Sequence, residues 1–165
     1  MASSVLQAGG PDAFQRRVLI TGASGALGKK MIEKFHVSGY QVIGTRSPFS
    51  QPSESVASES HWDKECKDLQ WRTVDVTVPE RVKELAKDVG RVDVLVHCAG
   101  GFRFSKTEDL KDDDIDFLVN TNLKSAMYLS REFLPVMKQQ NFGRIIFISA
   151  KSTMQPGAGS YNSPV

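Results

Sequence analysis

Three glycines lie close together near the start of the chain, in the segment TGASGALG at residues 21–28. Gly22 permits a tight turn, Gly25 lets backbone N–H groups approach a ligand closely, and Gly28 lets a following helix pack against a sheet. The N-terminus of that helix attracts a negative group, so the pyrophosphate of a dinucleotide is expected there. The candidate cofactor-binding residues of this loop are Gly22, Ser24, Gly25, Ala26, Leu27 and Gly28. The alternative is a purely structural turn.

A second group of polar residues ends the next apolar segment, VIGTRS at residues 42–47. An acid at the end of this strand would bind a ribose 2′-hydroxyl and favour NAD, whereas a nearby arginine would accommodate the 2′-phosphate of NADP. Arg46 stands at or beside that position, and Thr45 and Ser47 add hydroxyl groups. Arg46 can bind a phosphate bidentately. The pattern favours NADP(H) over NAD(H), and the alternative for Arg46 is a solvated loop arginine.

These candidate residues follow short apolar segments that alternate with amphipathic ones. Strands are predicted at residues 17–22, 40–45, 69–74, 92–100 and 143–149, and helices at 26–36, at 79–89 and in a long stretch around 115–133. Apolar strands alternating with helices indicate a parallel sheet covered on both faces. Right-handed crossovers make that sheet doubly wound. The predicted fold class is therefore α/β, a Rossmann-type doubly wound parallel sheet in three α/β/α layers.

Local signals predict where the first two helices lie and end. The apolar residues expected on one face of the first helix are Leu27, Met31, Ile32 and Phe35. Gly39 is expected to end that helix. Thr77 and Glu80 are expected to form a capping box at the second helix, with Pro79 in its first turn and Gly90 after its end.

The long third helix is predicted from a run of apolar residues at helical spacing. These residues are Ile115, Leu118, Val119, Leu123, Ala126, Leu129 and Phe133. Pro135 is expected to kink the helix. Between the second and third strands, residues 47–60 are rich in serine, which indicates a mobile loop.

Charge and composition exclude several classes of function. The chain has 21 basic and 19 acidic residues and a net charge of +2, which gives no electrostatic case for nucleic acid. No apolar run approaches the ~18 residues of a membrane helix, and the first residues lack a secretory signal. A weak organelle-targeting signal is the alternative for this lead. Cys66 and Cys98 show neither metal nor disulfide spacing, so we expect no metal site and a reducing compartment, the cytoplasm.

Several segments, in order along the chain, resemble the short-chain dehydrogenase/reductase family. The matching segments are TGASGALG (21–28), VDVT (74–77), HCAG (97–100) and VNTNLKS (119–125). The resemblance covers about residues 17–161. It implies an NAD(P)-dependent oxidoreductase that transfers a hydride between the nicotinamide and a small-molecule carbonyl or alcohol substrate. It also implies a homo-oligomer, a dimer or tetramer.

The resemblance assigns further residues to the cofactor site, namely Asp75, Val76, Cys98, Ala99 and Gly100. Asp75 and Val76 would meet the adenine, with Asp75 accepting its amino group, and the alternative for Asp75 is a turn-forming acid. Ala99 and Gly100 would keep the backbone flat against the cofactor. His97 stands where the family commonly has asparagine and is expected to be structural.

The family also places an asparagine and a serine in its catalytic site. The asparagine holds a water relay and the serine orients the substrate oxygen. Asn122 matches the asparagine, and its alternative is a structural tie between helix and strand. Ser149 is the candidate serine, although Ala150 takes the usual place and Ser152 is an alternative. The segment SAKSTM at 149–154 has a weak likeness to dihydropteridine reductases, a branch that lacks this serine.

A tyrosine completes the family's catalytic group, with a lysine four residues later that lowers its pKa. Tyr161 is the candidate tyrosine, but Val165 stands where the lysine is expected. We therefore expect residues 1–16 to form a flexible lead and residues 17–165 to form a dinucleotide-binding domain without the family's usual C-terminal strands, as part of a longer reductase. In that case a tyrosine beyond Val165 is the alternative to Tyr161. The alternative function is a non-catalytic dinucleotide-binding or regulatory protein.

Overall fold

Five parallel strands form one sheet in a computed structural model that describes residues 15–49, 66, 68–103 and 105–149. The strands are β1 (Arg17–Thr21), β2 (Gln41–Arg46), β3 (Gln70–Thr73), β4 (Val94–His97) and β5 (Arg144–Phe147). Their order across the sheet is β3-β2-β1-β4-β5, and every neighbouring pair is parallel. The chain thus leaves β1 in one direction and returns to its other side for β4. The predicted doubly wound sheet is confirmed.

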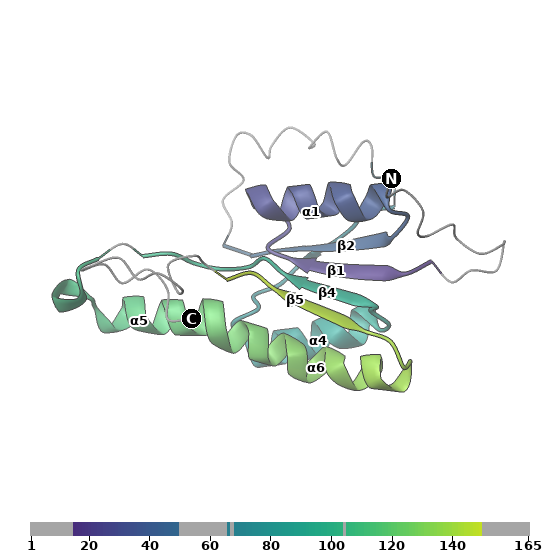
Figure 1. The fold of residues 1–165 in the computed structure, drawn as a ribbon. Coiled ribbons are helices and arrows are strands. Elements are labelled where there is room, and N and C mark those ends of the chain that lie inside the picture. Colours follow the sequence, from purple (N-terminus) through teal and green to yellow (C-terminus); the bar gives the residue numbers. More distant parts are fainter. Residues whose placement is uncertain (1–14, 50–65, 67, 104, 150–165) are drawn as a thin grey trace, which may run out of the picture.

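Helices lie on both faces of this sheet, which confirms the three predicted layers (Figure 1). α1 (Ala26–Val37) lies on one face, and α4 (Pro79–Val89) and α6 (Ser125–Gln139) lie on the other. α6 continues directly from α5 (Asp112–Leu118) and the π-helix η2 (Val119–Lys124), and a 3-10 turn, η1, spans Thr107–Asp109.

Successive residues of β1 face opposite layers of the molecule. Val18 and Ile20 pack in the cluster beneath α1 together with Ile32, whereas Leu19 packs beneath α4 and α6 together with Phe133. All five residues are at most 1% exposed. Because both faces of β1, β2 and β4 are covered, these strands are mostly apolar runs, and that is why they were recognisable in the sequence. The outer strands β3 and β5 are less buried.

The buried stripe of α1 differs from the predicted one by a single position. Gly28 and Ile32 are buried, and Phe35 packs against the same cluster. Leu27 is 42% exposed, so its predicted place on the buried face is wrong. The stripe begins at Gly28, and a glycine carries no hydrophobic signal in the sequence. Gly39, at φ +80°, follows the helix end as predicted.

The start of α4 is not the predicted capping box. Val78 is the N-cap and no side chain caps the helix there. Asp75 Oδ1 accepts hydrogen bonds from the Thr77 N–H at 2.9 Å and from the Thr77 hydroxyl at 2.7 Å. Thr77 therefore lies one residue before the N-cap, and its hydroxyl donates to Asp75 instead of capping the helix. Pro79 at the first position and Gly90 after the last residue are confirmed.

The long third helix changes its hydrogen bonding at η2, which the sequence pattern did not predict. A π-turn inserts an extra residue, so the helix faces before and after it are out of phase. Leu129 and Phe133 are fully buried, whereas Ile115 and Leu123 are 41% and 38% exposed. The single apolar face predicted for this stretch is therefore wrong for Ile115 and Leu123. α6 contains Pro135 and continues to Gln139.

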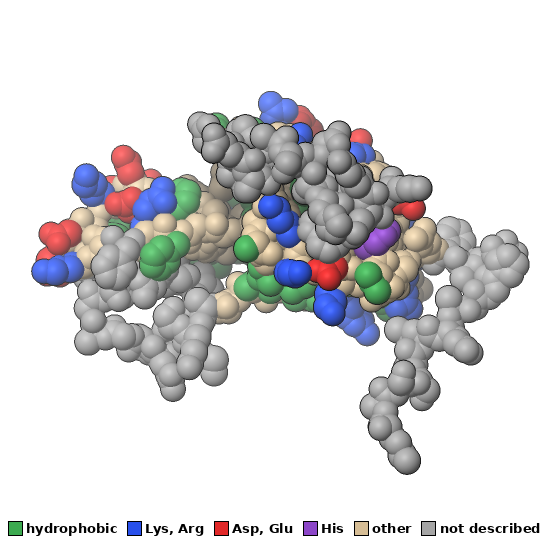
Figure 2. Space-filling model, turned by 90° about the horizontal axis from the view of Figure 1, so that it is seen from above, with side chains coloured by type: hydrophobic (Ala, Val, Ile, Leu, Met, Phe, Trp, Pro, Cys, Tyr) green, Lys and Arg blue, Asp and Glu red, His purple; other side chains and the backbone are tan. Residues whose placement is uncertain are grey.

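Basic and acidic side chains are interspersed on the face seen in Figure 2. This mixture matches the near balance of 21 basic and 19 acidic residues in the chain. Among the described residues, no helix combines the length and the apolar character that crossing a membrane requires.

Two leucines of α6 provide a matched test of this packing. Leu129 is fully buried and Leu134 is 41% exposed. We expect Leu129→Ala to lower the free energy of unfolding by about 2–5 kcal/mol, because it leaves a cavity between α6 and the sheet. Leu134→Ala should cost about 1 kcal/mol or less, because its side chain already contacts water. Urea unfolding of both variants measures the difference, and equal losses would contradict the assigned faces.

Candidate functional site

The first glycine of the loop is required both by its backbone conformation and by lack of space. Gly22 has φ +64°, which favours glycine. A Cβ added there would lie 2.6 Å from the Ala99 nitrogen and 2.8 Å from the Cys98 carbonyl carbon. The loop after β1 therefore rests directly on the backbone of the turn after β4.

The third glycine holds the loop against the start of α1. A Cβ on Gly28 would lie 2.4 Å from the Gly22 oxygen and 2.6 Å from Ala23 Cα, so it packs on the loop itself rather than on the sheet. Gly25 is the N-cap of α1, and its N–H donates to the Gly22 oxygen at 3.0 Å. The role of Gly25 in ligand approach stays a prediction.

The N-terminus of α1 fits an anionic group. No side chain caps the helix at Gly25, and its first turn carries no acidic residue. Ser24 is half-buried, and Gly25, Ala26 and Leu27 are exposed, so this turn presents its backbone at the surface. Backbone N–H groups of a first helical turn lack intrahelical partners and attract negative charge. A pyrophosphate is therefore compatible with this end of the helix.

The end of β2 lies beside the glycine loop. The Ala23 N–H donates to the Thr45 oxygen at 2.9 Å, which ties the two segments together. Arg46 is exposed, and its Nε donates to Thr73 Oγ1 at 3.2 Å. The Ser47 hydroxyl is also exposed and accepts from a backbone N–H, whereas Thr45 is only 1% exposed. Binding of a 2′-phosphate by these residues stays a prediction.

Asp75 forms a turn after β3. Its Oδ1 accepts both hydrogen bonds from Thr77 described above, which corresponds to the turn-forming alternative. Val76 beside it is 8% exposed and belongs to the core cluster beneath α4 and α6. Contact of these two residues with an adenine stays a prediction.

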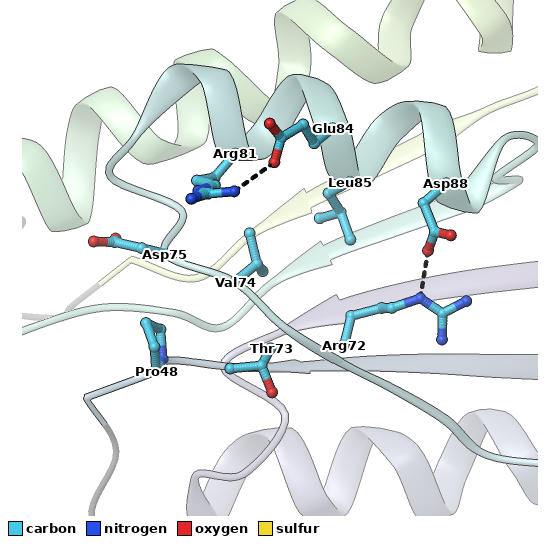
Figure 3. A pocket seen from close by; sticks show the side chains of 9 residues that line it. All are labelled: Pro48, Arg72, Thr73, Val74, Asp75, Arg81, Glu84, Leu85 and Asp88. Carbon is cyan, nitrogen blue, oxygen red and sulfur yellow. Dashed lines mark hydrogen bonds and ion pairs between the residues drawn. The ribbon is translucent and has the colours of Figure 1, made fainter.

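A hollow of about 410 Å³ lies between β3 and α4, with Asp75 at one end (Figure 3). Its charged side chains form ion pairs with one another. Arg81 Nη1 lies 2.9 Å from Glu84 Oε2, and Arg72 pairs with Asp88. The hollow lies on the α4 side of the sheet, whereas the glycine loop leads into α1 on the other side. Its lining nevertheless includes Thr73 and Asp75, so it adjoins the candidate cofactor residues at the ends of β2 and β3.

The turn after β4 is held by a side chain of the π-turn η2. Asn122 Oδ1 accepts a hydrogen bond from the Gly101 N–H at 2.8 Å, and Asn122 Nδ2 donates to the Gly101 oxygen at 3.0 Å. Gly100 lies beside this pair, since a Cβ there would be 3.2 Å from Asn122 Oδ1. This is the structural tie that was the alternative for Asn122. Its part in a water relay stays a prediction.

His97, at the end of β4, is buried between two hydroxyl groups. Its Nδ1 lies 2.7 Å from Thr21 Oγ1, and its Nε2 lies 3.0 Å from Ser125 Oγ. Burial lowers the pKa of His97 to about 4, so the ring is neutral at physiological pH. Burial also raises the pKa of the neighbouring Cys98 thiol. The expected structural role of His97 agrees with this geometry, but its partner Ser125, the last residue of the matching segment VNTNLKS, was given no role.

A hollow of about 850 Å³ lies beyond β4 and β5. The predicted site residues that line it are Cys98, Ala99, Gly100, Asn122 and Ser149. Much of the remaining wall is apolar and comes from Phe102, Leu123, Ala126, Met127, Phe147 and Ile148. Sequence reasoning missed these apolar residues as a site, because apolar positions on a helix and a strand were expected in the core.

The structure thus brings most predicted residues to one edge of the sheet. The carboxyl ends of parallel strands meet at that edge, beside the point where the strand order reverses between β1 and β4. Ser149 is exposed at the wall of the hollow. Ala150, Ser152 and the candidate tyrosine Tyr161 lie outside the described residues.

Comparison with known proteins gives consistent matches. The family described as short chain dehydrogenase matches residues 16–162. The chain is 29% identical over 140 residues to dehydrogenase/reductase SDR family member 6 of Xenopus laevis, which is 85% of this chain and 54% of that protein. It is 32% identical over 146 residues to the 3-oxoacyl-(acyl-carrier-protein) reductase FabG of Haemophilus influenzae, covering 87% of this chain and 59% of that protein.

Solved structures match as well. ElxO with NADP bound has a TM-score of 0.76 at 27% identity, over 87% of this chain and 59% of that one. Serine dehydrogenase from Escherichia coli has a TM-score of 0.74 at 26% identity, over 87% of this chain and 65% of that one. The chain spans a little more than half the length of these curated relatives.

The family match runs through every part of the site, from the glycine loop to Ser149. The doubly wound sheet and the contact between the glycine loop and the turn after β4 agree with it. The chain belongs to the short-chain dehydrogenase/reductase family.

Proposed function

We propose that this chain forms the cofactor site of an NAD(P)-dependent oxidoreductase that transfers a hydride between the nicotinamide and a carbonyl or alcohol. The observation that carries the proposal is the shared turn Cys98–Gly101. Gly22 of the glycine loop touches this turn, and the same turn lines the hollow of about 850 Å³. This arrangement supports one ligand with an anionic part at α1 and a flat part along the turn.

Each part of the site has a separate task in this proposal. NADP(H), when bound, supplies or accepts the hydride. The first turn of α1 binds negative charge, and Ala99 and Gly100 leave the backbone of the turn accessible to a flat group. Asn122 orients this turn through Gly101. Ser149 at the wall would donate a hydrogen bond to the substrate oxygen, and Tyr161 would transfer the proton.

We favour NADP(H) over NAD(H) because Arg46 is exposed at the end of β2. Its bond to Thr73 uses Nε, whereas a bidentate phosphate contact can use the two terminal nitrogens. The related structure with NADP bound supports this preference.

The apolar wall of the hollow supports a carbonyl substrate with apolar groups next to the reacting carbon. The similarity to a 3-oxoacyl reductase points to the same substrate class. Apolar side chains are also exposed on α6 and β5, at Met127, Leu134, Ile146, Phe147 and Ile148. These exposed apolar side chains support a homo-oligomer. We also propose that the protein lies in the cytoplasm.

A second candidate is a dinucleotide-binding protein without turnover. Val165 stands four residues after Tyr161, where the family's lysine is expected. Calorimetric titration with NADPH and NADH, followed by a turnover assay with a panel of 3-oxoacyl thioesters and apolar ketones, separates the two. Binding with turnover supports the reductase, and binding without turnover on any substrate supports the second candidate. If neither cofactor binds, both are wrong.

Arg46 provides a test of cofactor choice. We expect Arg46→Asp to raise the Kd for NADPH by roughly 10-fold or more, because a charge-assisted bond to the 2′-phosphate is replaced by repulsion. The Kd for NADH should change by less than about 3-fold, since it has no phosphate at that position. Arg131→Asp, an equal charge change at an exposed arginine of α6, is the control. An equal effect of Arg46→Asp on both cofactors would contradict the 2′-phosphate role.

Gly22 provides a test of the glycine loop. We expect Gly22→Val to abolish binding of both cofactors, because its side chain would meet the Ala99 backbone within 2.6 Å. Gly39→Ala is the matched control, since Gly39 also has a positive φ, +80°, but nothing lies within 4 Å of an added Cβ. It reports the backbone strain alone. Fluorescence titration gives the affinities and circular dichroism checks folding; a folded Gly22→Val that keeps its affinity would make the loop merely structural.

A further inference from the structure

A buried chain of hydrogen bonds joins the ends of β1 and β4 to the start of α6. His97 Nδ1 lies 2.7 Å from Thr21 Oγ1, and His97 Nε2 lies 3.0 Å from Ser125 Oγ. At the two ends of the chain, Ser125 Oγ lies 2.5 Å from the Thr121 carbonyl oxygen, and the Ala99 nitrogen lies 3.4 Å from Thr21 Oγ1. The residues Thr21, His97 and Ser125 are at most 5% exposed, so bulk water does not replace these bonds.

The direction of every proton in this chain follows from the acceptor at its end. The Thr121 carbonyl can only accept, so the single hydroxyl proton of Ser125 is donated to it. Ser125 Oγ must then accept from His97, which places the ring proton on Nε2. A neutral imidazole has one N–H, so Nδ1 accepts from the Thr21 hydroxyl. Thr21 Oγ1 in turn accepts from the Ala99 N–H.

The π-turn explains why Ser125 points this way. The Ser125 N–H donates to the Asn120 oxygen, five residues back, and not to the Thr121 oxygen as in an α-helix. The Thr121 carbonyl accepts from the Ser125 hydroxyl instead. The hydrogen bond between His97 and Ser125 therefore connects β4 to the same π-turn that carries Asn122.

Together these contacts hold the turn Cys98–Gly101 at both of its ends. One end of the turn follows His97, whose ring is tied to Ser125, and the other end is Gly101, which is tied to Asn122. We propose that His97 is a positioning residue that, as the Nε2–H tautomer, links β1 to the π-turn and thereby holds the turn Cys98–Gly101 in the conformation that receives the cofactor. The effect of His97 on cofactor binding rests on the proposed function, whereas its effect on the conformation of the turn does not.

The described groups that contact the ring carry no negative charge that would stabilise a second proton on it. They are Thr21 from β1, Ser125 from α6, the Thr121 carbonyl behind Ser125, and the Phe147 ring from β5 at 6.3 Å between centroids. A protonated Nδ1 could not accept from Thr21. The pKa of about 4 agrees with a ring that the site holds neutral.

Nitrogen NMR of the imidazole in the unmodified protein tests the tautomer directly. We expect the proton on Nε2 and a non-protonated Nδ1 between pH 6 and 8. This spectroscopic signature needs no variant and no cofactor. A proton on Nδ1 would overturn the proposal.

Replacing His97 by asparagine or by glutamine keeps one of its two hydrogen bonds, to Thr21 or to Ser125 respectively. In His97→Asn the amide oxygen can take the place of Nδ1 and accept from Thr21, while the bond to Ser125 is lost. In His97→Gln the amide nitrogen can take the place of Nε2 and donate to Ser125. Each variant breaks the link between β1 and the π-turn, so we expect hydrogen exchange of the Gly101 N–H, measured without cofactor, to accelerate by about 10-fold or more in both.

Ser125→Ala should reproduce the faster exchange of His97→Asn, and the double variant should show no further increase, because both changes remove the same bond. Ser38→Ala, an exposed serine after α1, is the control. Unchanged Gly101 exchange in all variants would overturn the positioning role. If NADPH fails to bind the unmodified protein while Gly101 responds as expected, the proposed function is wrong and this inference stands.

The pH dependence of stability gives a second readout. The folded state keeps His97 neutral down to about pH 4, whereas an ordinary histidine takes up its proton near 6.5. The unfolded chain therefore binds more protons in this window, and the stability contributed by His97 is lost as pH falls through it. We expect the difference in Tm between the unmodified protein and His97→Gln to shrink from pH 7 to pH 4. A difference that stays constant over this range would contradict the neutral ring.

Discussion

Gly22 and Ala99 touch backbone to backbone, with no room for a side chain between them. This contact exists because β1 pairs with β4, so that Thr21 lies beside His97 where the strand order reverses. An anion site at the first turn of α1 and a hollow beyond β4 would otherwise be unrelated features. The contact makes them neighbours, and every residue assigned to the site depends on it.

The turn after β4 gains its rigidity from groups that lie far away in the sequence. Asn122 satisfies both backbone groups of Gly101, and His97 connects the other end of the turn to Ser125. Buried polar groups cost free energy unless each finds a partner, so a fully satisfied network permits few alternative conformations. The π-turn η2 supplies both Asn122 and the carbonyl that orients Ser125, which explains why an irregular turn interrupts an otherwise regular helix.

Apolar runs bounded by glycines were sufficient to predict the sheet, its parallel pairing and the two helical layers, because burial on both faces leaves a clear pattern. The errors arose where a polar or small residue decided the outcome. Leu27 was misplaced because the buried stripe begins at Gly28, and the capping box is wrong because Val78, one residue after Thr77, is the N-cap. The glycine loop and Asn122 were visible as motifs. Ser125 lies in the matching segment VNTNLKS but was given no role, because its partner His97 lies 28 residues away and only the fold brings them together.

The pairing of β1 with β4 also has a consequence for folding. The hydroxyl of Thr21 and the ring of His97 are 76 residues apart in the chain, so their contact closes a long loop. Such closures cost more chain entropy than local pairings and slow the folding of parallel sheets. An intermediate with only β1, α1 and β2 in place would contain the glycine loop but not the turn against which it rests. Under the proposed function, a nicotinamide dinucleotide would therefore bind and stabilise chains in which β4 has paired with β1, and not this intermediate.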